Sequence, residues 1–71
     1  MQQFLERVAE VLEVPSIAPD FEFRDAPGWS SLMGFALLVM LDQTYHVRVG
    51  VEDFARLRTV ADLANAAGVR T

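Results

Sequence analysis

The chain contains no cysteine, no lysine and only one histidine. Without cysteine it can form neither a disulfide nor a thiolate zinc site, so any thiol chemistry must come from an added group. Without lysine it cannot form a Schiff base with a substrate. The 71 residues have room for one small domain, which we place over residues 1–71, and no room for the enclosed cleft of most enzymes.

Long hydrophobic runs and excess positive charge are also absent. No stretch approaches the roughly 18 apolar residues of a membrane span, and the N-terminus lacks the cationic start of a secretory signal, so we expect a soluble, cytoplasmic protein. The formal net charge is -4 at pH 7, and the acidic excess lies in residues 1–35. Because phosphate contacts need a basic surface, this charge argues against binding to nucleic acid.

Apolar residues at helical spacing predict a first helix that ends near Val14, with its charged residues on the opposite face. Prolines then interrupt residues 15–28, which should form a long ordered loop with room for one short turn of helix. A loop of this length in so small a domain is usually functional or tightly packed. We expect Phe21 and Phe23 to attach it to the core.

A second helix is predicted from Ser31 to Tyr45, with Asp42 as its only charged residue. Ser30 precedes it as the helix cap, because a serine hydroxyl can accept a hydrogen bond from an unpaired amide of the first turn. We expect His46, just after this helix, to interact with the last helical carbonyls rather than act as a base or a metal ligand.

Helical periodicity divides the side chains of this second helix between two sides. One side carries Leu38, Leu41 and Tyr45, and the other carries Met33, Ala36, Met40 and Gln43. One side must face the core. The other is then an unusually apolar exposed strip, although methionines at this spacing are also typical core filler.

The C-terminal third predicts a short helix over residues 52–57 and a last helix that starts at Thr59. Thr59 and Asp62 have the spacing of a capping box, and Gly68 is a natural stop. No alternating strand pattern of convincing length occurs. The predicted fold class is therefore all-α, a small four-helix bundle with three longer helices, one short helix and a long loop between the first two.

Several of these features occur in a fixed order: Ser31 and Leu32 open a long apolar helix, an aromatic ends it, a short acidic helix follows, and Thr59-Val60 begins the last helix. In this order they resemble an acyl carrier protein or the related peptidyl carrier domain, over nearly the whole chain. The family's Gly-x-Asp-Ser-Leu motif corresponds to residues 28–32. The resemblance implies that Ser31 bears the covalent cofactor 4'-phosphopantetheine and that the chain is a non-catalytic carrier of acyl groups held as thioesters.

The resemblance also implies the partners. A phosphopantetheinyl transferase would modify Ser31, which therefore needs no neighbouring base, and acyl- or aminoacyl-loading and condensing enzymes would use the arm. A phosphodiester on Ser31 would lie at a helix N-terminus, where free amides and the helix dipole favour an anion. Tethering gives the cargo a high effective concentration at each partner's active site.

Two departures from the family pattern concern these partners. Ser30 replaces the family's aspartate, which removes a charge that is usually presented to the modifying enzyme. The acidic flank of the second helix is replaced by the strip of Met33, Ala36, Met40 and Gln43, which we expect, together with Trp29, to bind partners. Such a surface favours apolar partners in a dedicated fatty-acid, polyketide or nonribosomal peptide pathway.

Other interpretations stay open on the residues alone. Ser31 could be a first-turn serine without chemistry, in a carrier-like domain that lacks the arm and binds proteins through its apolar face. Trp29 could pack the loop onto the helix or contact the arm. Arg56 and Arg58 lie near acidic residues and indicate a solvated patch rather than a DNA-binding module. We expect no metal site and a monomer.

Overall fold

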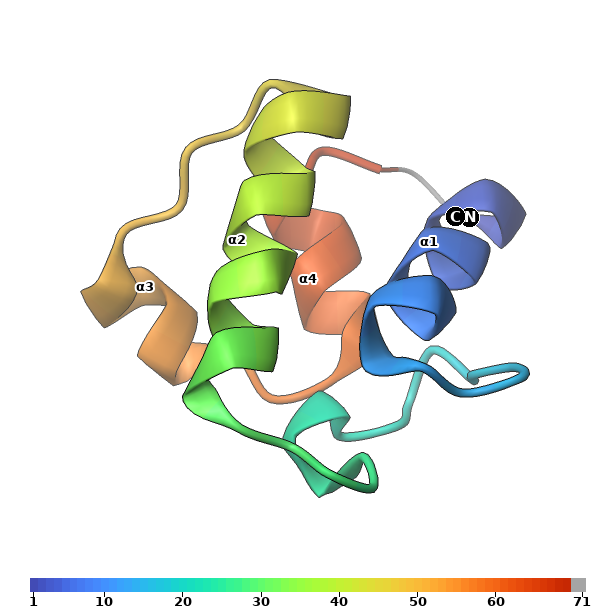
Figure 1. Cartoon of the computed structure of the whole chain (residues 1–71). Helices are drawn as coiled ribbons and strands as arrows, with labels where there is room; N and C mark the ends of the chain where they lie inside the picture. The colour runs from blue at the N-terminus through green and yellow to red at the C-terminus, as the bar shows by residue number, and fades with distance from the viewer. Residues whose placement is uncertain (70–71) are drawn as a thin grey trace.

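The computed structural model describes residues 1–69 and consists of four α-helices and one 3-10 turn. In chain order the elements are α1 (Gln2–Leu12), the 3-10 turn η1 (Phe23–Asp25), α2 (Ser31–Tyr45), α3 (Val51–Arg56) and α4 (Val60–Ala66), shown in Figure 1. The all-α prediction, with three longer helices and one short one, is confirmed. Residues 70–71, the end of the expected domain, lie outside the described residues.

The core lies where α1, α2 and α4 meet. α1 contacts both α2 and α4, and α3 lies on the side of α2 away from α1 (Figure 1). Apolar residues at helical spacing on α1 are buried because they face this junction. The largest fully buried side chains are Phe4, Val8 and Leu12 of α1, Phe23 of η1, Leu37 and Leu41 of α2, and Val60 and Leu63 of α4.

The long loop is ordered because its backbone completes the start of α4. The first amides of a helix have no partner inside the helix. Here the amide of Val60 donates to the carbonyl of Phe21 at 3.0 Å, and the amide of Ala61 donates to the carbonyl of Pro19 at 2.8 Å. The loop also contains the single short turn, η1, that was predicted, and Phe23 within it is fully buried. Attachment of the loop to the core through its aromatics is confirmed.

The predicted capping box at the start of α4 is present. The Thr59 hydroxyl accepts a hydrogen bond from the amide of Asp62 at 3.2 Å, and the Asp62 carboxylate accepts one from the amide of Thr59 at 3.1 Å. At the other end Gly68 has φ +75°, and the amide of Val69 donates to the carbonyl of Ala64 at 2.9 Å. This pattern of bonds closes the helix end at Gly68, as predicted.

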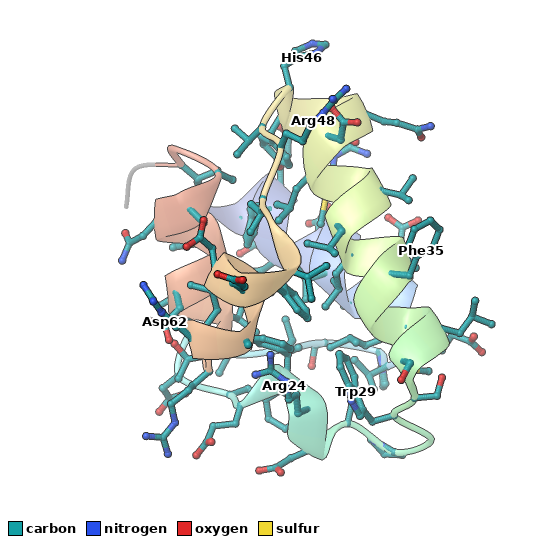
Figure 2. All side chains as sticks on the ribbon, turned by 90° about the vertical axis from the view of Figure 1, so that its left-hand side faces the viewer. Arg24, Trp29, Phe35, His46, Arg48 and Asp62 are labelled. Carbon is teal, nitrogen blue, oxygen red and sulfur yellow. The ribbon has the colours of Figure 1, made fainter. Side chains whose placement is uncertain are left out.

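The bounds of α2 match the prediction, and α3 begins at Val51, one residue earlier than expected. His46 interacts with the last helical carbonyls, as predicted, and it does so through its backbone. His46 takes the left-handed conformation, with φ 57°, and its backbone amide rather than its imidazole bonds the carbonyls of Asp42 and Leu41. In Figure 2 its side chain points away from the body of the protein.

The predicted rotation of α2 about its axis was wrong in part. The core side does include Leu41 and Tyr45, and the Tyr45 ring packs edge-on against Phe4 with ring centres 5.4 Å apart. The opposite strip was expected to be exposed. Instead Met33 and Met40 are half-buried and pack against the core. Because α2 is covered on one side by α1 and α4 and on the other by α3, both of its flanks are partly enclosed.

Candidate functional site

Ser31 is the first residue of α2, and its side chain is exposed. The chain reaches it through a tight turn in which the amide of Trp29 donates to the carbonyl of Ala26 at 3.1 Å. Pro27 and Gly28 occupy the centre of this turn. Gly28 has φ +74°, a value that glycine adopts without strain, so the sequence Pro-Gly suits the geometry. The turn thus places Ser31 at the surface directly after η1.

Ser30 occupies the cap position of α2, but its hydroxyl does not cap the helix. Its backbone is extended, with φ -152°, and its carbonyl accepts the first helical bond, from the amide of Gly34 at 3.2 Å. The hydroxyl accepts no hydrogen bond from the helix amides, so this part of the prediction was wrong. Among residues 1–69, the amides of Ser31, Leu32 and Met33 consequently have no acceptor.

The first turns of α2 and α4 therefore differ in how their backbone amides are bonded. The amides at the start of α4 are bonded to the loop and to Thr59, whereas those at the start of α2 are free and lie beside an exposed hydroxyl. Free amides and the helix dipole favour a negative group at that position. The start of α2 can accommodate a phosphodiester on the serine without displacing any existing hydrogen bond.

An open groove of about 340 Å³ begins at Ser31 and separates α2 from α3. It is lined by Arg24, Trp29, Ser31, Gly34, Phe35, Leu38, Val51 and Phe54. Figure 2 shows Trp29 near the first turn of α2, Arg24 on the side of Trp29 away from that helix, and Phe35 further along α2. The lining is mainly aromatic and aliphatic, with one cation.

Trp29 and Gly34 together form the floor of this groove. The Trp29 ring packs against Phe23, with ring centres 5.7 Å apart, which attaches the turn before α2 to the core. A Cβ atom on Gly34 would lie 3.5 Å from both Trp29 and Phe54, an ordinary contact distance, so both rings pack directly over this position of the helix. Trp29 therefore packs the loop onto the helix and also remains accessible from the groove.

Arg24 is a structural residue of the site that no sequence pattern indicated. Its guanidinium donates to the carbonyl of Leu57 and, at 2.9 Å, to the carbonyl of Phe54, which are the last carbonyls around the end of α3. It lies 4.6 Å from the centre of the Phe23 ring and 5.0 Å from that of Phe54. A lone arginine in a proline-rich loop carries no signal of a contact with a helix 30 residues away.

Apolar side chains near Ser31 form the outer surface of the site. Leu32, Phe35 and Val51 are 76%, 63% and 77% exposed. Of the residues expected to bind partners, Gln43 is exposed, whereas Trp29, Met33, Ala36 and Met40 are half-buried. The most accessible apolar side chains are therefore not the predicted methionines: Leu32 and Phe35 lie at other positions of the first turns of α2, and Val51 is the first residue of α3.

Residues 1–69 contain no group of three or more acidic or histidine side chains that could hold a metal ion. Nor is any helix within these residues long and apolar enough to cross a membrane.

Comparison with known proteins agrees with this geometry. The family model for the phosphopantetheine attachment site matches residues 2–67. The chain therefore belongs to the family of phosphopantetheine-binding carrier domains, which bear 4'-phosphopantetheine covalently and are carriers rather than catalysts. As carriers they interact with a phosphopantetheinyl transferase and with biosynthetic enzymes. No curated protein and no solved structure matches the chain.

Proposed function

We propose that this protein carries acyl or aminoacyl groups as thioesters on a 4'-phosphopantetheine arm attached to the hydroxyl oxygen of Ser31. The observation that supports this site is the open start of α2: an exposed serine beside three amides without acceptors. When bound, the arm supplies the thiol that the chain lacks. The free amides and the helix dipole would stabilise its phosphate by about 0.3–1 kcal/mol.

Ser30, in place of the family's aspartate, has two consequences for this proposal. A carboxylate next to Ser31 would repel the phosphate, and the neutral Ser30 hydroxyl does not. The transferase, however, would meet one fewer negative charge at the site. We therefore expect modification of Ser31 to depend more on apolar contacts.

The proposed docking surface for the transferase and the loading and condensing enzymes consists of Leu32, Phe35 and Val51, with Trp29 and Gln43 at its margins. Met33, Ala36 and Met40 contribute only their accessible edges. An apolar surface of this kind favours dedicated partners, and we place the carrier in a fatty-acid, polyketide or nonribosomal peptide pathway. A single domain, a monomeric state and a cytoplasmic location stay part of this proposal.

Intact-mass measurement tests the attachment residue directly. The full chain is incubated with coenzyme A and a broad-specificity phosphopantetheinyl transferase. The native protein should gain the mass of one phosphopantetheine group, and Ser31→Ala should gain none. The matched control is Ser30→Ala, which should be modified to the same extent because its hydroxyl makes no capping bond. Modification of Ser31→Ala would overturn the site.

A second candidate is a carrier-like domain that works without an arm and binds proteins through the same apolar surface. The strong exposure of Leu32, Phe35 and Val51 favours this candidate as much as the first. The two differ in what Ser31 does. If several transferases leave the native chain unmodified, while Ser31→Ala keeps its biological activity and Phe35→Glu loses it, the armless function is correct.

A further inference from the structure

A second apolar surface lies along α1 and the loop that follows it, away from the groove beside Ser31. It consists of two adjoining grooves of about 420 and 470 Å³, one along α1 and one beneath the following loop. Val14 and Ser16 line both grooves, so the two grooves share a border. Neither groove shares a lining residue with the groove beside Ser31. We call these two adjoining grooves together the α1 groove.

The floor of the α1 groove is apolar. Leu5 and Ala9 of α1 line its first part, and Ile17 and Phe21 of the loop line the second. Leu5, Ile17 and Phe21 are half-buried and pack against the core, so each presents a fixed apolar surface to solvent. Residues that are rigid and partly exposed in this way suit recognition of an apolar side chain.

The rim of the α1 groove is acidic. Glu6, Glu10 and Asp20 line it, and no arginine does. The only ion pair within residues 1–69 joins Arg58 to Glu22, so none of the three rim carboxylates has a cation within ion-pair distance in the described structure. The groove beside Ser31 has the opposite character, because its one charged lining residue is Arg24.

An apolar floor with an uncompensated acidic rim is complementary to a helix that has one apolar face and basic flanks. An anionic membrane surface would be repelled by the same rim. α1 has 11 residues and so spans about 16 Å, enough for roughly three turns of a docked helix. We propose that the α1 groove binds a basic amphipathic helical segment of a partner protein, at a position that leaves Ser31 and its groove free.

Binding at the α1 groove does not depend on the phosphopantetheine arm. A partner held at the α1 groove could retain the domain while other proteins approach Ser31, since the two grooves lie on opposite sides of α2, beside α1 and α3 in Figure 1. The affinity of the α1 groove for its partner should therefore be the same in Ser31→Ala as in the native chain.

The test uses the full chain and a synthetic leucine-lysine peptide of about 18 residues, long enough to form an amphipathic helix. Amide chemical shifts should change along α1 and residues 14–21. The double variant Glu6→Gln with Glu10→Gln should weaken binding by roughly fivefold. The matched control, Glu52→Gln with Asp53→Asn, removes the same charge from α3 and should change the affinity much less.

A variant that blocks the surface completes the test. Ser16 is exposed and lines both parts of the α1 groove, so Ser16→Trp should obstruct it without removing core contacts. Equal weakening by both charge-removing pairs would show non-specific attraction and overturn the proposal. Shifts confined to Leu32, Phe35 and Val51 would overturn it as well. The proposal would also be overturned if sedimentation showed a dimer of the native chain that dissociates in the double variant Glu6→Gln with Glu10→Gln, because the occupant of the groove would then be a second copy of this chain.

Discussion

Arg24 donates a hydrogen bond to the backbone carbonyl of Phe54 and at the same time lies over the ring of that residue. Phe54 is the only buried residue of α3, a helix of six residues that is far too short to be stable alone. The position of α3 therefore depends on this contact and on the packing of Phe54 against Phe23, with ring centres 5.5 Å apart. Since α3 forms one wall of the groove beside Ser31, Arg24 determines the shape of that groove.

Replacing Arg24 by alanine should loosen α3. Hydrogen bonds from charged donors contribute about 1.5–3 kcal/mol, so the free energy of unfolding should fall by about 2 kcal/mol. Amide hydrogen exchange should rise most in residues 51–57. Arg24→Lys should recover only part of the loss, because one ammonium group does not reproduce a planar fork over two carbonyls. Arg56→Ala, at an exposed position of α3, is the control, and an equal effect there would contradict the role of Arg24.

Replacing Gly34 by alanine should stabilise the protein. Glycine inside a helix is less favourable than alanine by about 0.5–1 kcal/mol, and the added Cβ would meet Trp29 and Phe54 at ordinary contact distance. Gly34→Leu should instead lower the stability by about 1–3 kcal/mol, since its branches would enter the space of the two rings. Thermal unfolding measures both. A loss of stability in Gly34→Ala would mean that the rings lie closer to α2 than described.

Stability should depend on pH through Asp62. Hydrogen bonds from the backbone amides of Arg58 and Thr59, at 2.9 and 3.1 Å, hold the pKa of this carboxyl below its ordinary value of 3.8. Because the pKa is lower in the folded state, the stabilisation is fully present above about pH 5 and is lost as the pH falls through the folded pKa. Chemical denaturation of the native chain and of Asp62→Asn should give a stability difference that shrinks on acidification.

Thr59→Ala is the control for the pH dependence of stability in Asp62→Asn. The threonine hydroxyl does not titrate, and loss of this cap should lower stability by about 1 kcal/mol at neutral pH. If the difference between the native chain and Asp62→Asn stayed constant from neutral pH to about pH 2, the lowered pKa would be contradicted.

Phe35 and Met40 should separate docking from folding. Phe35 is largely exposed, so Phe35→Ser should change stability by less than about 0.5 kcal/mol while lowering kcat/KM for arm addition at Ser31. Met40 is half-buried against the core, so Met40→Ser should lower stability by about 1–2 kcal/mol. If Phe35→Ser is modified at the native rate, the transferase does not dock on the proposed surface.

The sequence by itself determined the local features of this protein. The bounds of α2, the capping box of Thr59 and Asp62 and the end at Gly68 could be predicted because they depend on residues within one or two turns of each other. The order of these features was also enough to indicate the carrier family, which the match over residues 2–67 confirms.

Only the tertiary structure decided the rotation of α2, the open amides beside Ser31 and the contact of Arg24 with α3. A periodic pattern defines which side chains share a face, but the elements that pack on each side decide which face is buried. Whether a serine such as Ser30 caps its helix depends on its conformation rather than on its identity. The bond from Arg24 to Phe54 joins residues 30 positions apart, a distance over which the chain carries no local signal.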